Sequence, residues 1–196
     1  MRNTPEAALG LSVHTGWAAM IAVSGVVRAA EILDRRRVEM LTGTDPPRFA
    51  YHAARELAPA AGQRLVDDAA ERSRAHARAA LEDALSALGD HRAVAAGVVV
   101  GNQPLDADYA TIVESHARIH AAEGALFRGA IADACRALRL RVIEVRAADL
   151  EALGAAAMGV RPGELARRLD AFGHAAGRPW SKDQRDAYLA ALISLG

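Results

Sequence analysis

The stretch ALGLSVHTGWAAMIAV, residues 8–23, contains two apolar runs separated only by His14, Thr15 and Gly16. Short apolar runs with so tight a connection predict two antiparallel strands joined in a hairpin. A Ser-Gly pair follows, and the next run, VVRAAEILDRRRVEM (residues 26–40), contains a third strand pattern. The N-terminal part of the chain is therefore expected to be an antiparallel meander of three strands.

Helix and strand patterns alternate along the rest of the chain. An Ala- and Arg-rich stretch over residues 49–88, with a break at Pro59, predicts helix, and the glycine-ended apolar run 93–101 predicts a buried strand. A long helix is expected over residues 106–138, a strand over 140–146, and helices over 147–158, 162–174 and 182–195. The start of the last helix is indicated by Ser181 and Gln184, which have the spacing of a capping box.

This order, βββ-α-β-α-β-α with extra C-terminal helices, predicts an α/β fold with a mixed five-stranded sheet and helices on both faces. Residues 9–13 are expected to form the central strand, hydrogen-bonded to the strand that contains residues 98–100. A chain of 196 residues, 52% of them hydrophobic, is sufficient for one core, so a single domain over residues 1–196 is expected. Residues 1–7 are expected to be a flexible tail.

Charge and composition exclude several classes of protein. The 24 basic residues balance 24 acidic ones, so a broad positive field for nucleic-acid binding is excluded and any such contact must be local. No uninterrupted apolar stretch is long enough for a membrane span. The first apolar run is interrupted at His14 and preceded by Pro5 and Glu6, unlike a signal peptide, and the lone Cys135 fits a reducing compartment, so a cytoplasmic location is expected. The oligomeric state stays open.

The segment SHARIHAAEG, residues 115–124, places His116, His120 and Glu123 in the same helical arc as the apolar residues of the long helix. Arg128 lies outside this arc, on the expected solvent side. Buried polar side chains need partners, an ion or a wet cleft, and side chains four residues apart lie near enough to share one ion. Two interpretations stay open: a site for a metal or an anion, or core histidines bonded to carbonyl groups.

Other polar residues are candidates for the same site. His14 ends the first strand, where α/β sheets gather ligands, and is therefore expected in one cavity with the helix residues. His52 lies at the start of the first long helix, and the run DRRR (residues 34–37) is expected to be a solvated face, or a phosphate-binding patch if it lies near the histidines. The expected catalytic residues are Glu123, His14, His52 and Asp183, and the expected metal ligands are His116, His120, Glu123 and Asp183. Histidine ligands favour zinc, manganese or iron.

Three motifs, LGLSVHTGWA, GVVVGNQP and WSKDQRDAYLAA, resemble the ribonuclease H-like superfamily, in particular its RuvC-type resolvase branch. The resemblance implies the mixed five-stranded sheet. It also implies acidic residues on the first strand, near the end of the fourth and on the last helix, which together hold two divalent metal ions. Ser12 and Asn102 occupy the first two of these positions, and only Asp183 matches. One aspartate does not supply the oxygen ligands of two ions, so the implied metal centre is altered.

Two functions follow from these patterns. One is a divergent, metal-dependent phosphodiesterase or nuclease that acts on nucleic acid through the histidine-rich site. The alternative is a catalytically inactive binding or scaffold protein of the same fold, which recognises a nucleic acid, a nucleotide or a protein partner.

Overall fold

The computed structural model describes residues 4–43, 46–101 and 106–196. The elements in chain order are β1 (Glu6–His14), β2 (Trp17–Ser24), η1 (Val27–Ala29), β3 (Glu31–Glu39), α1 (Ala50–Ala54), α2 (Pro59–Ser86), β4 (Arg92–Val100), α3 (Tyr109–Val113), α4 (His116–Ala137), β5 (Arg141–Arg146), α5 (Leu150–Met158), α6 (Pro162–Ala176) and α7 (Lys182–Leu195). The predicted order of strands is confirmed. So are the break before Pro59 and the capping box of Ser181 and Gln184.

The sheet is mixed and has five strands in the order β3-β2-β1-β4-β5. Strand β1 is antiparallel to β2 and parallel to β4, which is parallel to β5. Leu11 pairs with Val98 and Ser12 with Val99, as predicted for the central strand. The fold class is therefore confirmed, and the carboxyl ends of β1 and β4 lie at the same edge of the sheet.

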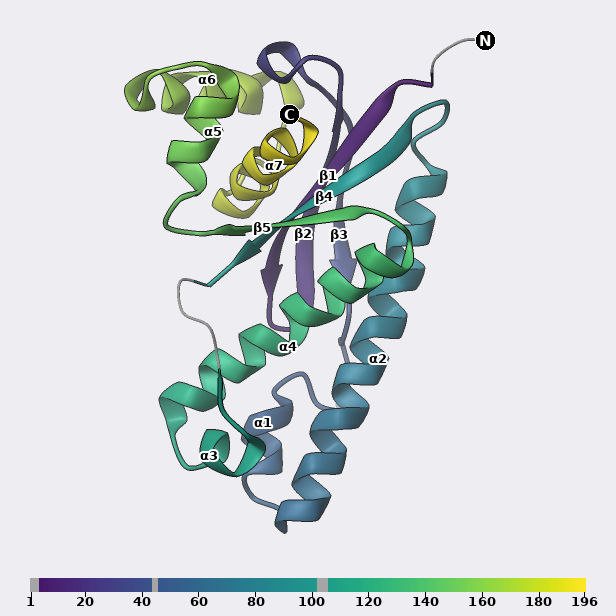
Figure 1. Cartoon of the computed structure of the whole chain (residues 1–196), viewed down its shortest axis with the longest axis vertical. Helices are drawn as coiled ribbons and strands as arrows, with labels where there is room; N and C mark the ends of the chain where they lie inside the picture. Colours follow the sequence, from purple (N-terminus) through teal and green to yellow (C-terminus); the bar gives the residue numbers. More distant parts are fainter. Residues whose placement is uncertain (1–3, 44–45, 102–105) are drawn as a thin grey trace.

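Helices cover both faces of the sheet (Figure 1). Helix α7, with α5 and α6, lies over one face, and α2 and α4 lie over the other. Successive side chains of a strand point to opposite faces, so Leu11 and Met20 are buried with Phe127 of α4, whereas Ile21 is buried with Tyr188 of α7. The short helices α1 and α3 lie beyond the sheet, near the N-terminal end of α4 (Figure 1).

Helix α7 lies in close backbone contact with the two central strands. A methyl group at Gly10 of β1 would overlap the carbonyl of Ala187 and the amide of Ala191, and one at Gly97 of β4 would overlap the carbonyl of Ala190. Glycine is required at both positions because another backbone approaches there. This contact fixes the first turn of α7 beside the end of β1.

The long helix expected over residues 106–138 is two helices, α3 and α4, so that prediction is wrong in this detail. The chain breaks at Ser115, whose backbone is extended (φ −128°, ψ 122°). Ile112 of α3 and Ile119 of α4 are buried in one small cluster. The break allows both residues to be buried together, and His116 becomes the first residue of α4.

The sheet begins earlier than the sequence suggested. Residues 1–7 were expected to be a flexible tail, but β1 starts at Glu6, and Ala7 is fully buried. The reason is that β4 also starts early: the Arg92 amide donates to the Pro5 carbonyl at 2.9 Å. Residues 1–3 of this expected tail lie outside the described residues.

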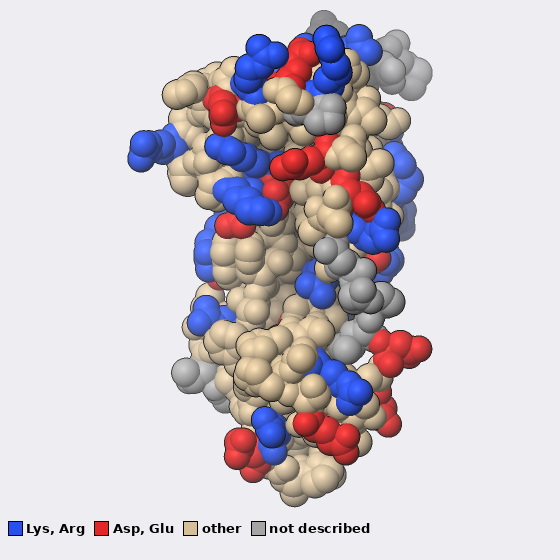
Figure 2. Space-filling model, turned by 90° about the vertical axis from the view of Figure 1, so that its left-hand side faces the viewer, with Lys and Arg blue, Asp and Glu red and all other residues tan. Residues whose placement is uncertain are grey.

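Charged groups of both signs are interspersed over the face shown in Figure 2, with no large area of one sign. This distribution agrees with the balanced composition and keeps any contact with a polyanion local. Among the described helices, none combines the length and apolarity needed to cross a membrane.

Candidate functional site

The candidate residues form two groups. Ring contacts, hydrogen bonds and ion pairs link His52 to His116, His120 and Glu123, and a separate hydrogen bond links His14 to Asp183. Within residues 4–43, 46–101 and 106–196, no hydrogen bond, ion pair or ring contact joins the two groups. The contacts thus divide the residues that were expected to share one cavity.

His52, His116 and His120, called here the three-histidine cluster, are close enough to share one ion. One ligand nitrogen from each residue lies within 4.8 Å of the others. The ring centroids of His116 and His120 are 4.4 Å apart, and that of His52 is 4.8 Å from His120. The Nε2 atoms of His116 and His120 are 2.9 Å apart. This is the donor set of a site for one metal ion with three nitrogen ligands.

Helix geometry explains how the cluster forms. His116 and His120 are four residues apart at the start of α4 and share one face, and His52 is supplied by α1 in the connection between β3 and α2. The prediction that His116 and His120 face the core is wrong, since both are exposed. The reason is that α4 extends past the edge of the sheet, so its first turns pack against α1 and α3 (Figure 1). The core-histidine interpretation does not hold for these two residues.

Glu123 holds His52 in place from the buried side of the cluster. It is 2% exposed, and its Oε1 accepts hydrogen bonds from the Tyr51 amide at 2.9 Å and from the His52 amide at 3.3 Å. The same oxygen lies 3.3 Å from His52 Nδ1. Burial raises the pKa of Glu123, although hydrogen bonds from His52 oppose the shift. A donor bond from Nδ1 leaves His52 Nε2 as the ligand atom, which is the usual carboxylate–histidine–metal arrangement.

Glu123 is therefore expected to orient a ligand, whereas the sequence had suggested it as a ligand itself. Glu123→Ala should lower the free energy of unfolding by about 1 to 3 kcal/mol, because the amides of Tyr51 and His52 lose a buried acceptor. Glu123→Gln retains an oxygen for these amides and should fold normally. Without the negative charge, however, metal affinity should fall about 10- to 100-fold. Urea denaturation and calorimetric zinc titration measure the two effects, and wild-type zinc affinity in Glu123→Gln would contradict the assignment.

The second group lies where β1 ends and α7 begins. His14 Nε2 and Asp183 Oδ1 are 2.9 Å apart, and both side chains are partly exposed. The His14 ring stacks on Trp17 with centroids 4.4 Å apart. The guanidinium of Arg37 lies over the same indole, 3.8 Å from its centroid. Asp183 therefore has a histidine as its partner.

The residues at this edge do not fit the two-metal centre that the resemblance implies. Ser12 of β1, at the position of the expected aspartate, is 5% exposed and offers no carboxylate. Asp183 is bound to His14, and Asn102 lies outside the described residues. In the described part of the chain, the three-histidine cluster is the group of potential metal ligands whose donor atoms lie within 4.8 Å of one another. The described residues at this edge therefore do not supply the ligands of a two-metal centre.

The arginine run of residues 34–37 is largely engaged in the fold. Arg35 donates to the carbonyls of Gly177 and Pro179, both at 2.9 Å. Arg36 forms ion pairs with Asp34 and Asp83. These contacts support a structural role for Arg35 and Arg36, whereas Arg37 lies over Trp17 beside the His14–Asp183 pair. The run lies near His14, and no contact of Arg35, Arg36 or Arg37 with the three-histidine cluster is seen among the described residues.

Sequence reasoning missed Arg128, which it assigned to the solvent side of the long helix. The residue is only partly exposed, and its guanidinium lies over Gly124 and beside Gly101. The available signal was the spacing of Gly124 and Arg128, four residues apart on one helical face, which lets the long side chain lie across the glycine.

Comparisons with known proteins identify the fold. No family model and no curated protein matches the chain. The structure of Thermus thermophilus RuvC in complex with a Holliday junction substrate is similar at a TM-score of 0.55 and 15% identity, over 96% of this chain and 91% of that one. A second Thermus thermophilus RuvC structure is similar at a TM-score of 0.52 and 12% identity, over 95% and 91%. The fold is thus ribonuclease H-like and of the RuvC type, as the sequence resemblance implied.

Proposed function

We propose that the protein is a metal-dependent phosphodiesterase that acts on nucleic acid, with one transition-metal ion at the three-histidine cluster. The carrying observation is the convergence of His52, His116 and His120 within 4.8 Å, with His52 held by the buried carboxylate of Glu123. His116 and His120 are exposed, so they are not part of the hydrophobic core, and packing of the core does not explain their convergence.

The three imidazole groups of the cluster are suitable ligands for a transition-metal ion. Imidazole nitrogens suit zinc, manganese or iron better than magnesium. Three protein ligands leave a coordination position open, as in catalytic zinc sites. Tetrahedral coordination would widen the gap of 2.9 Å between the Nε2 atoms of His116 and His120 to roughly 3.3 Å, a small adjustment for exposed side chains. A bound metal would supply acidification of water and polarisation of a phosphoryl oxygen.

The protein's own residues determine what reaches this site. His116 and His120 are exposed on α4, so within the described part of the chain a long polymer can reach the cluster from solvent. Glu123 is buried behind them and positions His52. A polyanion that binds here would be held by local contacts, since the 24 basic residues are balanced by 24 acidic ones.

The substrate class is part of the proposal. One of the similar structures contains RuvC with a Holliday junction, and nucleic acid is accordingly the first substrate to test for this chain. The three-histidine cluster is built from α1 and α4, whereas the His14–Asp183 pair lies at the end of β1. The reaction would therefore be centred on a different part of the fold from the carboxylate positions that the resemblance indicates.

A second function is favoured by the His14–Asp183 pair. Among the described residues at this edge of the sheet, Ser12 supplies no carboxylate and Asp183 is hydrogen-bonded to His14, unlike the set of carboxylates that the resemblance implies. This observation supports a non-catalytic protein that binds nucleic acid, a nucleotide or a protein partner. Binding of one of these ligands without cleavage of nucleic acid would favour this second function over the first.

The experiment is a cleavage assay with protein purified without a histidine tag, stripped of metal and reloaded with zinc, manganese or iron. Single-stranded, duplex and branched DNA and RNA are the substrates. We expect cleavage of at least one substrate that requires metal and falls to the level of the metal-free protein in His120→Ala. His174→Ala is the matched control, since His174 is exposed on α6 outside both groups, and it should cleave like wild type. Binding of the substrates without cleavage in any metal would overturn the proposal.

A further inference from the structure

The Arg128 guanidinium lies between Gly101, at the end of β4, and Gly124 on the surface of α4. A methyl group at Gly124 would lie 2.6 Å from Arg128 Nη1, and one at Gly101, just after β4, would lie 3.6 Å from Nη2. The guanidinium therefore lies directly over Gly124, and the missing side chain there is what leaves room for it. Both glycines flank the same group.

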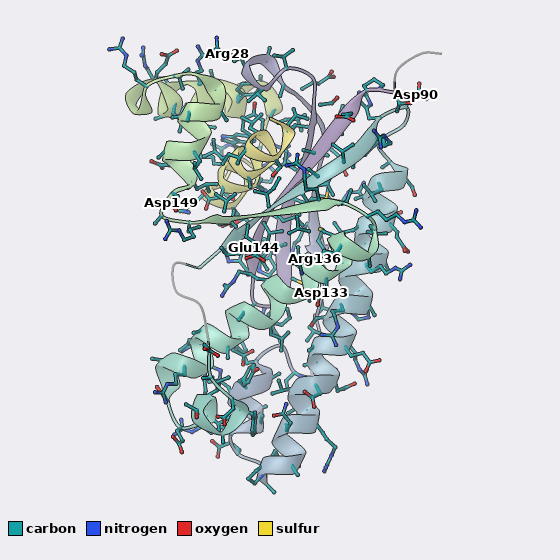
Figure 3. The ribbon with its side chains drawn as sticks, in the orientation of Figure 1. Arg28, Asp90, Asp133, Arg136, Glu144 and Asp149 are labelled. Carbon is teal, nitrogen blue, oxygen red and sulfur yellow. The ribbon has the colours of Figure 1, made fainter. Side chains whose placement is uncertain are left out.

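This guanidinium lacks a direct partner in the described part of the chain. Among the described residues, no hydrogen bond or ion pair involves Arg128. Glu144, the acidic residue that acts on it electrostatically, is 3.6 Å from Arg136, and Figure 3 shows these two side chains near each other at the C-terminal end of α4. Burial lowers the pKa of Arg128. Because Glu144 is shared with Arg136, it balances the half-buried charge of Arg128 only in part, and an anion from outside would complete the balance.

The position of Arg128 relates it to the three-histidine cluster. His116, His120, Gly124 and Arg128 are spaced by four residues and form one row along α4. Helical side chains lean toward the N-terminus, and Arg128 does so, because Nη1 lies over Gly124. The guanidinium is thus about one helical turn, roughly 5 Å, beyond His120. One turn is comparable with the separation of neighbouring phosphates in a nucleic-acid strand.

We propose that Arg128 binds a backbone phosphate of a nucleic-acid strand, next to the phosphate that lies at the three-histidine cluster. The inference rests on the proposed function and adds the direction of the strand, along the row on α4. A guanidinium presents a planar pair of donors that matches two phosphate oxygens. Gly124 leaves space for the guanidinium in this position, since a side chain there would displace it.

The test measures binding of a fluorescent single-stranded oligonucleotide to metal-free protein at several salt concentrations. Arg128→Gln should weaken binding about tenfold, since a charged hydrogen bond is worth about 1.5 kcal/mol or more. It should also reduce the slope of log K against log salt by about 0.7, the value for one phosphate contact on a single strand. Gly124→Ala should weaken binding in the same direction. The matched control is Arg136→Gln on the same helix, whose arginine is exposed and already paired with Asp133, and it should change neither quantity.

The melting temperature separates binding from a structural role. Arg128→Gln removes an unpaired half-buried charge and should melt at or above the wild-type temperature. The proposal would be overturned if Arg128→Gln melted at a lower temperature than wild type, or if it kept the wild-type affinity and salt slope. An equal loss of affinity in Arg136→Gln would also overturn it. Oligonucleotide binding is measured without metal, so its result does not depend on cleavage. If the wild-type protein bound no metal, the proposed function would be contradicted, but the effect of Arg128→Gln on binding would still test the role of Arg128.

Discussion

Gly10→Ala should unfold the protein or lower its free energy of unfolding by more than about 4 kcal/mol, a loss seen only for severe defects. A methyl group at this position would overlap the carbonyl of Ala187 and the amide of Ala191, both in the backbone of α7. An overlap with the end of a side chain can be relieved by a change of rotamer, but a helix backbone can only move away as a unit. Moving α7 would expose its own side chains Tyr188 and Leu192, which are fully buried against the sheet.

Gly129→Ala is the matched control, because the same change on α4 meets open space. Alanine is favoured over glycine inside a helix, so this variant should gain about 0.5 to 1 kcal/mol. Urea denaturation followed by circular dichroism compares the two variants. A Gly10→Ala protein within about 1 kcal/mol of wild type, the usual size of a mild substitution, would show that α7 does not rest on β1.

The second large effect concerns His116→Ala and His120→Ala. Both histidines are exposed, so in metal-free protein each change should alter the free energy of unfolding by less than about 0.5 kcal/mol. A metal present at a hundred times its dissociation constant should stabilise wild type by about 2.7 kcal/mol and should not stabilise the variants. For a domain of this size, that gain raises the melting temperature by roughly 5 to 10 °C.

Thermal denaturation with and without zinc measures this difference, with His174→Ala as the variant that should keep the metal-dependent shift. Losses of stability in His116→Ala and His120→Ala that are the same with and without zinc would contradict the metal assignment. Such losses would mean that the two histidines have structural partners.

Most of the fold was predictable because its signals are local. The connection at His14 to Gly16 fixes the first hairpin, and Gly25 permits the next turn with a positive φ of 95°. The capping box of Ser181 and Gln184 marks the start of α7. The break at Ser115 was missed, because the burial of Ile112 with Ile119 depends on contacts that form only when the chain has folded.

The candidate site was predictable only in part. Helical spacing places His116, His120 and Glu123 on successive turns of α4, each of them contacts His52, and Glu123 is buried as expected. Helical periodicity does not show where a helix runs past the edge of the sheet, so the exposure of the two histidines was missed. The pairing of His52 with Glu123 and of His14 with Asp183 depends on how α1 and α7 pack against distant elements. Spacing along the chain carries no information about those contacts.

The most direct test of the three-histidine metal centre is the metal content of tag-free protein after loading with zinc and removal of the excess by dialysis. We expect one zinc ion per chain in wild type, as measured by elemental analysis, with X-ray absorption showing three imidazole ligands. His52→Ala, His116→Ala and His120→Ala should each lose the ion, whereas Asp183→Asn and His14→Ala should retain it. Wild-type protein without bound zinc, or zinc that persists when the cluster histidines are replaced, would contradict the metal centre and with it the proposed function.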